Sequence, residues 1–131
     1  GVIDVQDALA GPPAYDVVSL LQDARIDVPL PVFDRCLNHY VRRRFDTKTG
    51  AARRFREAFA ILGLQRNLKI AGIFVRLALR DNKPQYRAHL PRILDYVQTN
   101  LAHEAATPVC DWLETHAPDW AARMNDPQEP A

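Results

Sequence analysis

Apolar residues recur every three or four positions through most of the chain, and this spacing predicts a protein built mainly from α-helices. The prolines at 12–13 and 29–31 interrupt the pattern and separate two such segments. We therefore expect a first helix at about residues 14–26 and a second at about 31–45. Val2-Ile3 precedes these helices and is expected to be the stub of a β-strand whose partner lies upstream of the chain.

The longest uninterrupted pattern is the proline-free stretch from about Ala51 to Leu79. From Ala58 onward, apolar residues occur on nearly every side of the helical wheel, which predicts a helix buried on all sides. Gly63 and Gly72 each cost about 1 kcal/mol relative to alanine inside a helix, and they indicate the close approach of another backbone. The stretch also resembles a membrane span in length, but three basic residues within it argue against that interpretation.

Prolines also mark the starts of the later helices, since proline suits the first turn of a helix. A turn at residues 81–84 is followed by a short helical piece at 84–89, and Pro91 then begins an amphipathic helix. Thr107 as a cap and Pro108 at the first helical position predict a further helix. The side chains of that helix expected to face inward are Val109, Trp112 and Leu113. With one more turn near the C-terminus, the pattern amounts to six or so helices.

The length of 131 residues fits one domain. With 47% hydrophobic and 25% charged residues, the composition is that of a globular protein rather than a disordered one. We divide the helical domain, 1–124, into a metal-binding strand and turn at 1–13 and helices at 14–124, and expect a flexible tail at 125–131. Two cysteines make no disulfide framework and no signal-peptide pattern opens the chain, so we expect a cytoplasmic protein with free thiols.

The net charge is only +1, but the charges are unevenly distributed. Residues 35–56 contain eight basic residues and one acid, whereas residues 1–34 contain six acids and one base. A basic segment of this kind either is a solvated helix face or attracts the phosphates of a nucleotide or nucleic acid. We favour the solvated face, because most charged helix faces have no other role.

The first seventeen residues carry landmarks in a fixed order: an apolar run with acids at Ile3–Asp7, a turn at Gly11-Pro12, and an aromatic-acid pair in Tyr15–Val17. This order resembles the metal-binding segment of the aminoglycoside phosphotransferase and choline kinase family, distant relatives of the protein kinases. Leu62–Phe74 and Asp81–Pro84 resemble more narrowly the bacterial branch that includes the N-acetylmuramate/N-acetylglucosamine kinases. The likeness covers most of the chain.

By this resemblance the chain is the helical part of the C-terminal lobe of a protein-kinase-like fold. The implied activity is transfer of phosphate from ATP to an amino sugar, with Mg²⁺ as the metal. The sequence contains no glycine-rich phosphate loop, catalytic base or following asparagine of the kind such transfer requires, and in the family these lie upstream. We therefore expect no catalytic residue in this chain, and no activity without its expected partners, the N-terminal lobe and the catalytic loop.

Asp4 is the candidate metal ligand. In the family an aspartate at this place holds Mg²⁺ against the β- and γ-phosphates, and a carboxylate at a strand end is a suitable hard ligand. The alternative is that Asp4 only caps a turn. Val5 stands where the family usually has Phe or Trp, which leaves the carboxylate intact. Gln6 and Asp7 either help to place the metal or a substrate hydroxyl or belong to the turn, and Asp16 is expected to be structural.

Arg66, Asn67 and Lys69 are the candidate substrate-binding residues, because polar groups inside an apolar helix require partners. A sugar offers hydroxyl and amide oxygens to such donors. The alternative is an internal ion pair with an acid of the same chain. The acids considered for that pair are Asp16, Asp23 and Glu57.

Three functional interpretations follow. The first is an amino-sugar kinase, and the second is a phosphotransferase for aminoglycosides or other amino alcohols, which uses the same chemistry. The third is a helical binding module without catalysis that uses the basic segment to hold an acidic partner or nucleic acid. A small sugar is the expected substrate, and neither a membrane nor nucleic acid is an expected partner.

Overall fold

The computed structural model describes residues 10–125, so the strand stub expected at Val2-Ile3 and the end of the expected tail lie outside the described residues. Within that range the chain is mostly helical and contains no strand, which confirms the prediction of a mainly α protein. The α-helices are α1 (Ala14–Leu21), α2 (Leu30–Arg44), α3 (Ala51–Leu79), α4 (Leu90–Leu101), α5 (Thr107–His116) and α6 (Trp120–Asn125). Short 3₁₀ segments lie at Thr47–Thr49, Pro84–His89 and Glu104–Ala106.

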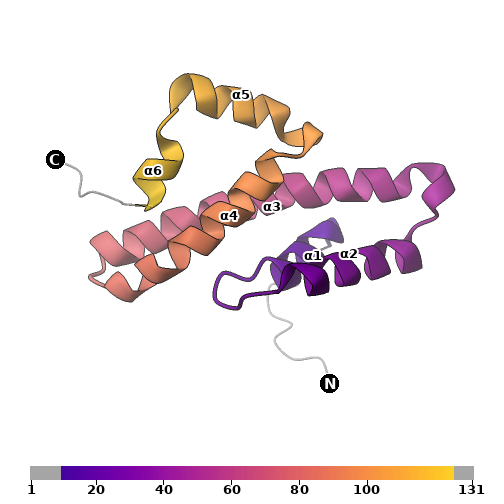
Figure 1. Cartoon of the computed structure of the whole chain (residues 1–131), viewed down its shortest axis with the longest axis horizontal. Coiled ribbons are helices and arrows are strands. Elements are labelled where there is room, and N and C mark those ends of the chain that lie inside the picture. Colours follow the sequence, from indigo (N-terminus) through magenta and orange to yellow (C-terminus); the bar gives the residue numbers. More distant parts are fainter. Residues whose placement is uncertain (1–9, 126–131) are drawn as a thin grey trace.

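Helix α3 forms the long axis of the molecule, and the other helices are arranged along it (Figure 1). Helices α1 and α2 lie along its N-terminal half, whereas α4 returns antiparallel along its C-terminal half. Between α3 and α4, Asn82 adopts a left-handed conformation with φ 50°, which asparagine tolerates better than most residues. The Lys83 N–H donates to the Leu77 carbonyl at 2.9 Å. The turn predicted at 81–84 is therefore present.

Only one stripe of α3 is buried, so the prediction that this helix is buried on all sides is wrong. The buried residues of α3 are Phe55, Phe59, Ala60, Gly63, Leu64, Asn67, Ala71, Phe74 and Ala78. These positions are spaced by three or four residues because α1, α2 and α4 cover one side of the helix. On the other side Ile61 is 38% exposed. Helix α3 is long and apolar enough to cross a membrane, judged by length and composition alone. The core helix of a soluble protein meets the same criteria.

Three apolar clusters fill the space between the helices. In the first, among α1, α2 and the N-terminal half of α3, the rings of Phe45 and Phe55 lie 4.9 Å apart and Phe33 meets Phe59 edge-on. In the second, Leu90 and Ile93 of α4 are fully buried against the C-terminal half of α3. A smaller third cluster connects α3, α4 and the 3₁₀ segment before α5. Burial of these apolar side chains is the main stabilising contribution.

Helix α1 ends at Leu21, five residues before the predicted end at about 26. At Gln22 the backbone leaves the helical region, with φ −118° and ψ 54°. The carboxylate of Asp23 then accepts hydrogen bonds from the N–H groups of Arg25 and Ile26, at 2.7 and 2.9 Å. A short acid that bonds the backbone two and three residues ahead competes with the helix and favours a turn.

The inward packing predicted for α5 is largely wrong. Trp112 is 58% exposed and Val109 37% exposed, and Leu113 is only half-buried. Thr107 is the first helical residue rather than the cap, and its hydroxyl donates to the Glu104 carbonyl at 2.8 Å. The helix packs only on the end of α4 and the 3₁₀ segment before it, so its apolar face has little to cover it.

One of the two predicted close approaches to a glycine of α3 is present, but a side chain makes it rather than a backbone. A Cβ atom on Gly63 would lie 2.8 Å from Nδ2 and 2.9 Å from Oδ1 of Asn100 on α4. A Cβ atom on Gly72 would meet nothing within 4 Å, so the prediction is wrong at that position. Gly63 therefore allows α4 to approach α3 at Asn100.

The substitution Gly63→Ala should destabilise the protein by about 1–3 kcal/mol, because Asn100 is buried and must move away from the new methyl group. Gly72→Ala is the matched control, and it should stabilise the protein by roughly 0.5–1 kcal/mol through helix propensity alone. Urea unfolding followed by circular dichroism measures both. Equal effects of the two substitutions would contradict the close approach at Gly63.

Candidate functional site

Three buried amide side chains meet where the segment after α1 crosses α3 and α4. Oε1 of Gln22 accepts from Nδ2 of Asn67 on α3 at 2.6 Å and from Nδ2 of Asn100 on α4 at 3.0 Å. Nε2 of Gln22 donates back to Oδ1 of Asn100 at 3.3 Å. We call Gln22, Asn67 and Asn100 the amide cluster. It joins three elements that are 45 and 78 residues apart in the sequence.

The amide cluster is closed to solvent. Gln22 and Asn67 have no exposed surface and Asn100 is 3% exposed. Because a buried amide without a hydrogen bond costs about 1–3 kcal/mol, the three side chains require one another in this arrangement. Oδ1 of Asn67 is a buried oxygen to which the structure gives no hydrogen-bond partner.

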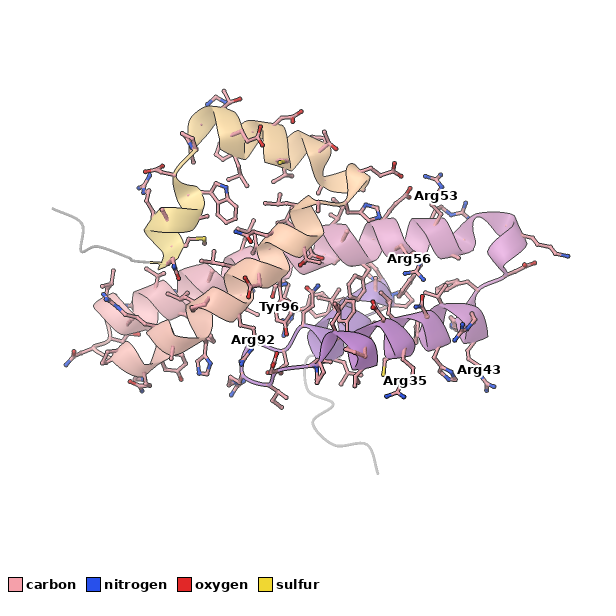
Figure 2. All side chains as sticks on the ribbon, in the orientation of Figure 1. Arg35, Arg43, Arg53, Arg56, Arg92 and Tyr96 are labelled. Atoms are coloured by element: carbon pink, nitrogen blue, oxygen red, sulfur yellow. The ribbon has the colours of Figure 1, made fainter. Side chains whose placement is uncertain are left out.

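Two arginines hold the segment after α1, residues 22–27, which we call the crossing loop. Arg66 on α3 donates to the carbonyl of Gln22 at 3.2 Å, and Arg92 on α4 donates to the carbonyl of Ala24 at 3.4 Å. Nε of Arg92 also lies 3.8 Å from the carboxylate of Asp27. Figure 2 shows Arg92 projecting from α4 toward this loop. The crossing loop is thus bonded to α3 and α4 through its own backbone.

Two titratable groups near the crossing loop have shifted pKa values. The backbone N–H of Arg25, helped by that of Ile26, lowers the pKa of Asp23 below its ordinary value, because both bonds favour the carboxylate. Burial raises the pKa of the Tyr96 hydroxyl, which has no hydrogen-bond partner in the structure and lies on the same side of α4 as Arg92 (Figure 2). At neutral pH the carboxylate of Asp23 in the loop is therefore ionised, and the phenol of Tyr96 on α4 is neutral.

The structure brings two of the three candidate substrate-binding residues to the crossing loop. Asn67 belongs to the amide cluster, and Arg66 donates to the loop backbone rather than forming one of the predicted ion pairs. Arg66 does contribute by its charge to the lowered pKa of Asp23. Lys69 is exposed on α3 and does not join them. The pairing considered with Glu57 is taken instead by Arg53.

The remaining predicted site residues are not near this loop or are not described. Asp16 is exposed on α1. Asp4, Gln6 and Asp7 lie outside the described residues, so their predicted roles stay predictions. Within residues 10–125, no group of three or more His, Cys, Asp or Glu side chains is placed to bind a metal ion. Cys36 and Cys110 are free thiols, as expected.

Sequence reasoning missed Gln22, Asn100, Arg92 and Tyr96. A usable signal was present for the two amides, because each stands at a position where the helical period of its neighbours calls for an apolar residue. Gln22 follows Ala14 and Val18, and Asn100 follows Ile93 and Val97, at the expected spacing. A polar residue in such a position predicts a buried hydrogen bond, but its partner cannot be read from the local pattern.

No protein-family model matches the chain. The chain is similar to curated bacterial proteins named N-acetylmuramate/N-acetylglucosamine kinase. That of Pseudomonas aeruginosa is 40% identical over 107 residues, which cover 78% of this chain and 31% of the relative. That of Neisseria meningitidis is 44% identical over 101 residues, covering 75% and 30%, and that of Caulobacter vibrioides is 34% identical over 118 residues, covering 90% and 32%. The chain spans about a third of the length of these relatives.

The substitution Gln22→Ala should destabilise the protein by about 2–4 kcal/mol, because it leaves amide groups of both Asn67 and Asn100 buried without a partner. Gln98→Ala, at an exposed position of α4, is the control and should change stability by less than about 0.5 kcal/mol. Chemical denaturation of the two variants gives the comparison. A loss below about 1 kcal/mol for Gln22→Ala would show that the amide cluster is not a constraint on the fold.

The carboxylate of Asp23 should stabilise the fold above its unfolded-state pKa of about 3.8 and lose that effect as the pH falls through its lowered native pKa. Wild type should therefore be more stable than Asp23→Asn at pH 7, and the difference should shrink below about pH 4. Thermal unfolding of both proteins at about pH 7 and at several lower values down to about pH 2.5 measures the difference. A difference independent of pH would exclude a role for the charge.

Proposed function

We propose that this chain is the C-terminal portion of an ATP-dependent kinase that phosphorylates N-acetylmuramate or N-acetylglucosamine. The observation that carries the proposal is the 34–44% identity to proteins that bear this kinase name. The ordered landmarks at the start of the chain and the mainly α architecture agree with the helical part of a kinase C-terminal lobe. Because ATP is made and used in the cytoplasm, we also propose a cytoplasmic location.

Phosphoryl transfer to a sugar hydroxyl depends mostly on positioning and on neutralising the charge of the phosphates. Mg²⁺ supplies that neutralisation when it is bound, and we assign Asp4 as its ligand in this chain. Asp7 and Gln6 remain candidates for contacts with the substrate. In this proposal the nucleotide-binding lobe belongs to the part of the complete kinase outside this chain. The base that accepts the proton of the sugar hydroxyl belongs to that part as well. The chain is then inactive by itself.

The crossing loop is our candidate for the substrate side of that site. Its backbone is held by Arg66 and Arg92 and by the amide cluster, so its side chains project from a rigid base. A polar sugar requires several fixed donors and acceptors, because each hydroxyl that leaves water must regain its hydrogen bonds. Asn67 supports the loop from within, whereas Arg66 is the donor we propose for the sugar. Lys69 lies apart from the loop, so its role in substrate binding stays a prediction.

Phosphotransferases for aminoglycosides or other amino alcohols use the same chemistry, and the substrate side alone separates them from a sugar kinase. The names of the relatives favour the amino sugar. We therefore keep the amino-sugar kinase as the proposed function, with ATP and Mg²⁺ as its cofactors.

The complete gene product that contains this chain should consume ATP with N-acetylmuramate or N-acetylglucosamine. The substitution Asp4→Asn should lower kcat on the order of a hundredfold or more, because charge stabilisation by the metal would be lost. Asp111→Asn, at an exposed position of α5, is the matched control and should leave kcat unchanged. A coupled assay of ADP release measures the rates, and circular dichroism checks the helical content.

Absence of turnover with any amino sugar, aminoglycoside or amino alcohol would overturn the kinase proposal. Normal turnover of the Asp4→Asn variant would leave the kinase standing but remove the metal role of Asp4. Turnover with an aminoglycoside alone would move the protein to the second branch of the same chemistry.

A further inference from the structure

A groove of about 980 Å³ runs between α1 and α2, on a part of the molecule that the crossing loop does not occupy. We call it the α1–α2 groove. Its α1 side includes Asp16, Val17, Leu20 and Leu21, and its α2 side includes Arg35, Tyr40 and Arg43. Its floor is mainly aliphatic and aromatic, and its α2 wall is basic.

The apolar part of the groove is open to solvent in this chain. Leu20 is 73% exposed, and Val17, one turn before it on the same helix, is only half-buried. Helix α1 thus buries one stripe, with Ala14, Val18 and Leu21, and leaves Val17 and Leu20 beside that stripe incompletely covered. Large apolar side chains that lie together at the surface mark a contact with another element.

The basic wall carries charge that the rest of the described chain does not neutralise. Arg35 and Arg43 project from α2 on the side away from α3 (Figure 2). The ion pairs within residues 10–125 join Arg53 to Glu57, Arg80 to Asp81, Arg92 to Asp27 and Arg123 to Asp119, and none includes an arginine of the groove. The one acid among the lining residues is Asp16. An occupant with apolar side chains and acidic edges would match both properties.

We propose that the α1–α2 groove binds an amphipathic helix with acids along one edge, contributed by the part of the kinase that lies outside this chain. This inference rests on the proposed function, in which the chain is a portion of a larger enzyme. The relatives are long enough to contain such a helix outside the matched region, because this chain spans only about 30% of their length. From Arg35 to Arg43 the wall extends about 12 Å along α2, which accommodates roughly two turns of a helix.

Two other occupants fit the groove less well. Nucleic acid would satisfy the arginines, but its phosphates have no use for the floor formed by Val17, Leu20 and Leu21. A second copy related by a two-fold axis would bring the arginine wall of one α2 helix close to that of the other, and like charges repel. A helix with an apolar face and an acidic edge meets neither difficulty.

The test compares Leu20→Glu with Val109→Glu in the complete gene product and in this chain alone. Both residues are exposed and apolar, but Val109 lies on α5, outside the groove. In the complete protein Leu20→Glu should lower the Tm by about 5 °C or more, because it puts a charge into a buried contact, and Val109→Glu should change it by less than about 2 °C. In this chain alone both changes should stay below about 2 °C.

Arg43→Glu should lower the Tm of the complete protein more at low salt than at high salt.

Equal Tm values for wild type and Leu20→Glu in the complete protein would overturn the docking proposal. An equal loss in this chain alone would overturn it too, since Leu20 would then act within the chain. Light scattering tests whether a second copy occupies the groove. If the complete protein is a dimer and Leu20→Glu dissociates it, the groove serves self-association and the proposed occupant is wrong. These experiments measure Tm and molecular mass and do not depend on enzymatic activity. A complete protein without sugar kinase activity would therefore refute the proposed function but would not affect the docking result.

Discussion

The hydrogen bonds of the amide cluster are the constraint on which the rest of the structure depends. Gln22 can satisfy its side chain only if Asn67 and Asn100 stand opposite it, because all three amides are closed to water. Apolar packing between α3 and α4 would tolerate several alignments, since one aliphatic side chain replaces another with small loss. A buried amide tolerates only the alignment in which its partners are present. The cluster therefore sets the register of α4 on α3, with Gly63 providing the space.

The same constraint explains why α1 is short and why the crossing loop is ordered. Once the side chain of Gln22 is bonded to α3 and α4, the chain must turn, and the carboxylate of Asp23 supports that turn. Arg66 and Arg92 then bond carbonyl groups that the helix no longer satisfies. Arginines have two different roles in this chain. At the proposed substrate side they bond the backbone of the crossing loop. Along the α1–α2 groove they form no ion pair within the described residues, and we infer that another segment supplies the acids.

Helices whose limits are marked by prolines and turns could be predicted closely. The limits of α2, α3 and the short 3₁₀ segment at Pro84–His89 agree with the predictions within a residue, because local signals decide them. The predictions for α1 and α5 failed where the outcome depended on neighbours. Gln22 ends α1 through distant partners, and Trp112 stays exposed because the described residues leave most of the apolar face of α5 uncovered. Of the candidate site, Arg66 and Asn67 were found as polar residues in an apolar helix, but their partners were not.

The sequence by itself determined the helical period, the helix limits set by proline, the concentration of basic charge in residues 35–56, and the resemblance to a kinase family. These are properties of residues close together in the chain. Only the tertiary structure decided which side of α3 is buried, which amide meets which, and that the arginines of α2 border an apolar groove. The physical reason is that a hydrogen bond across 78 residues, or a groove between two helices, depends on how the helices pack, and a local period carries no record of that packing.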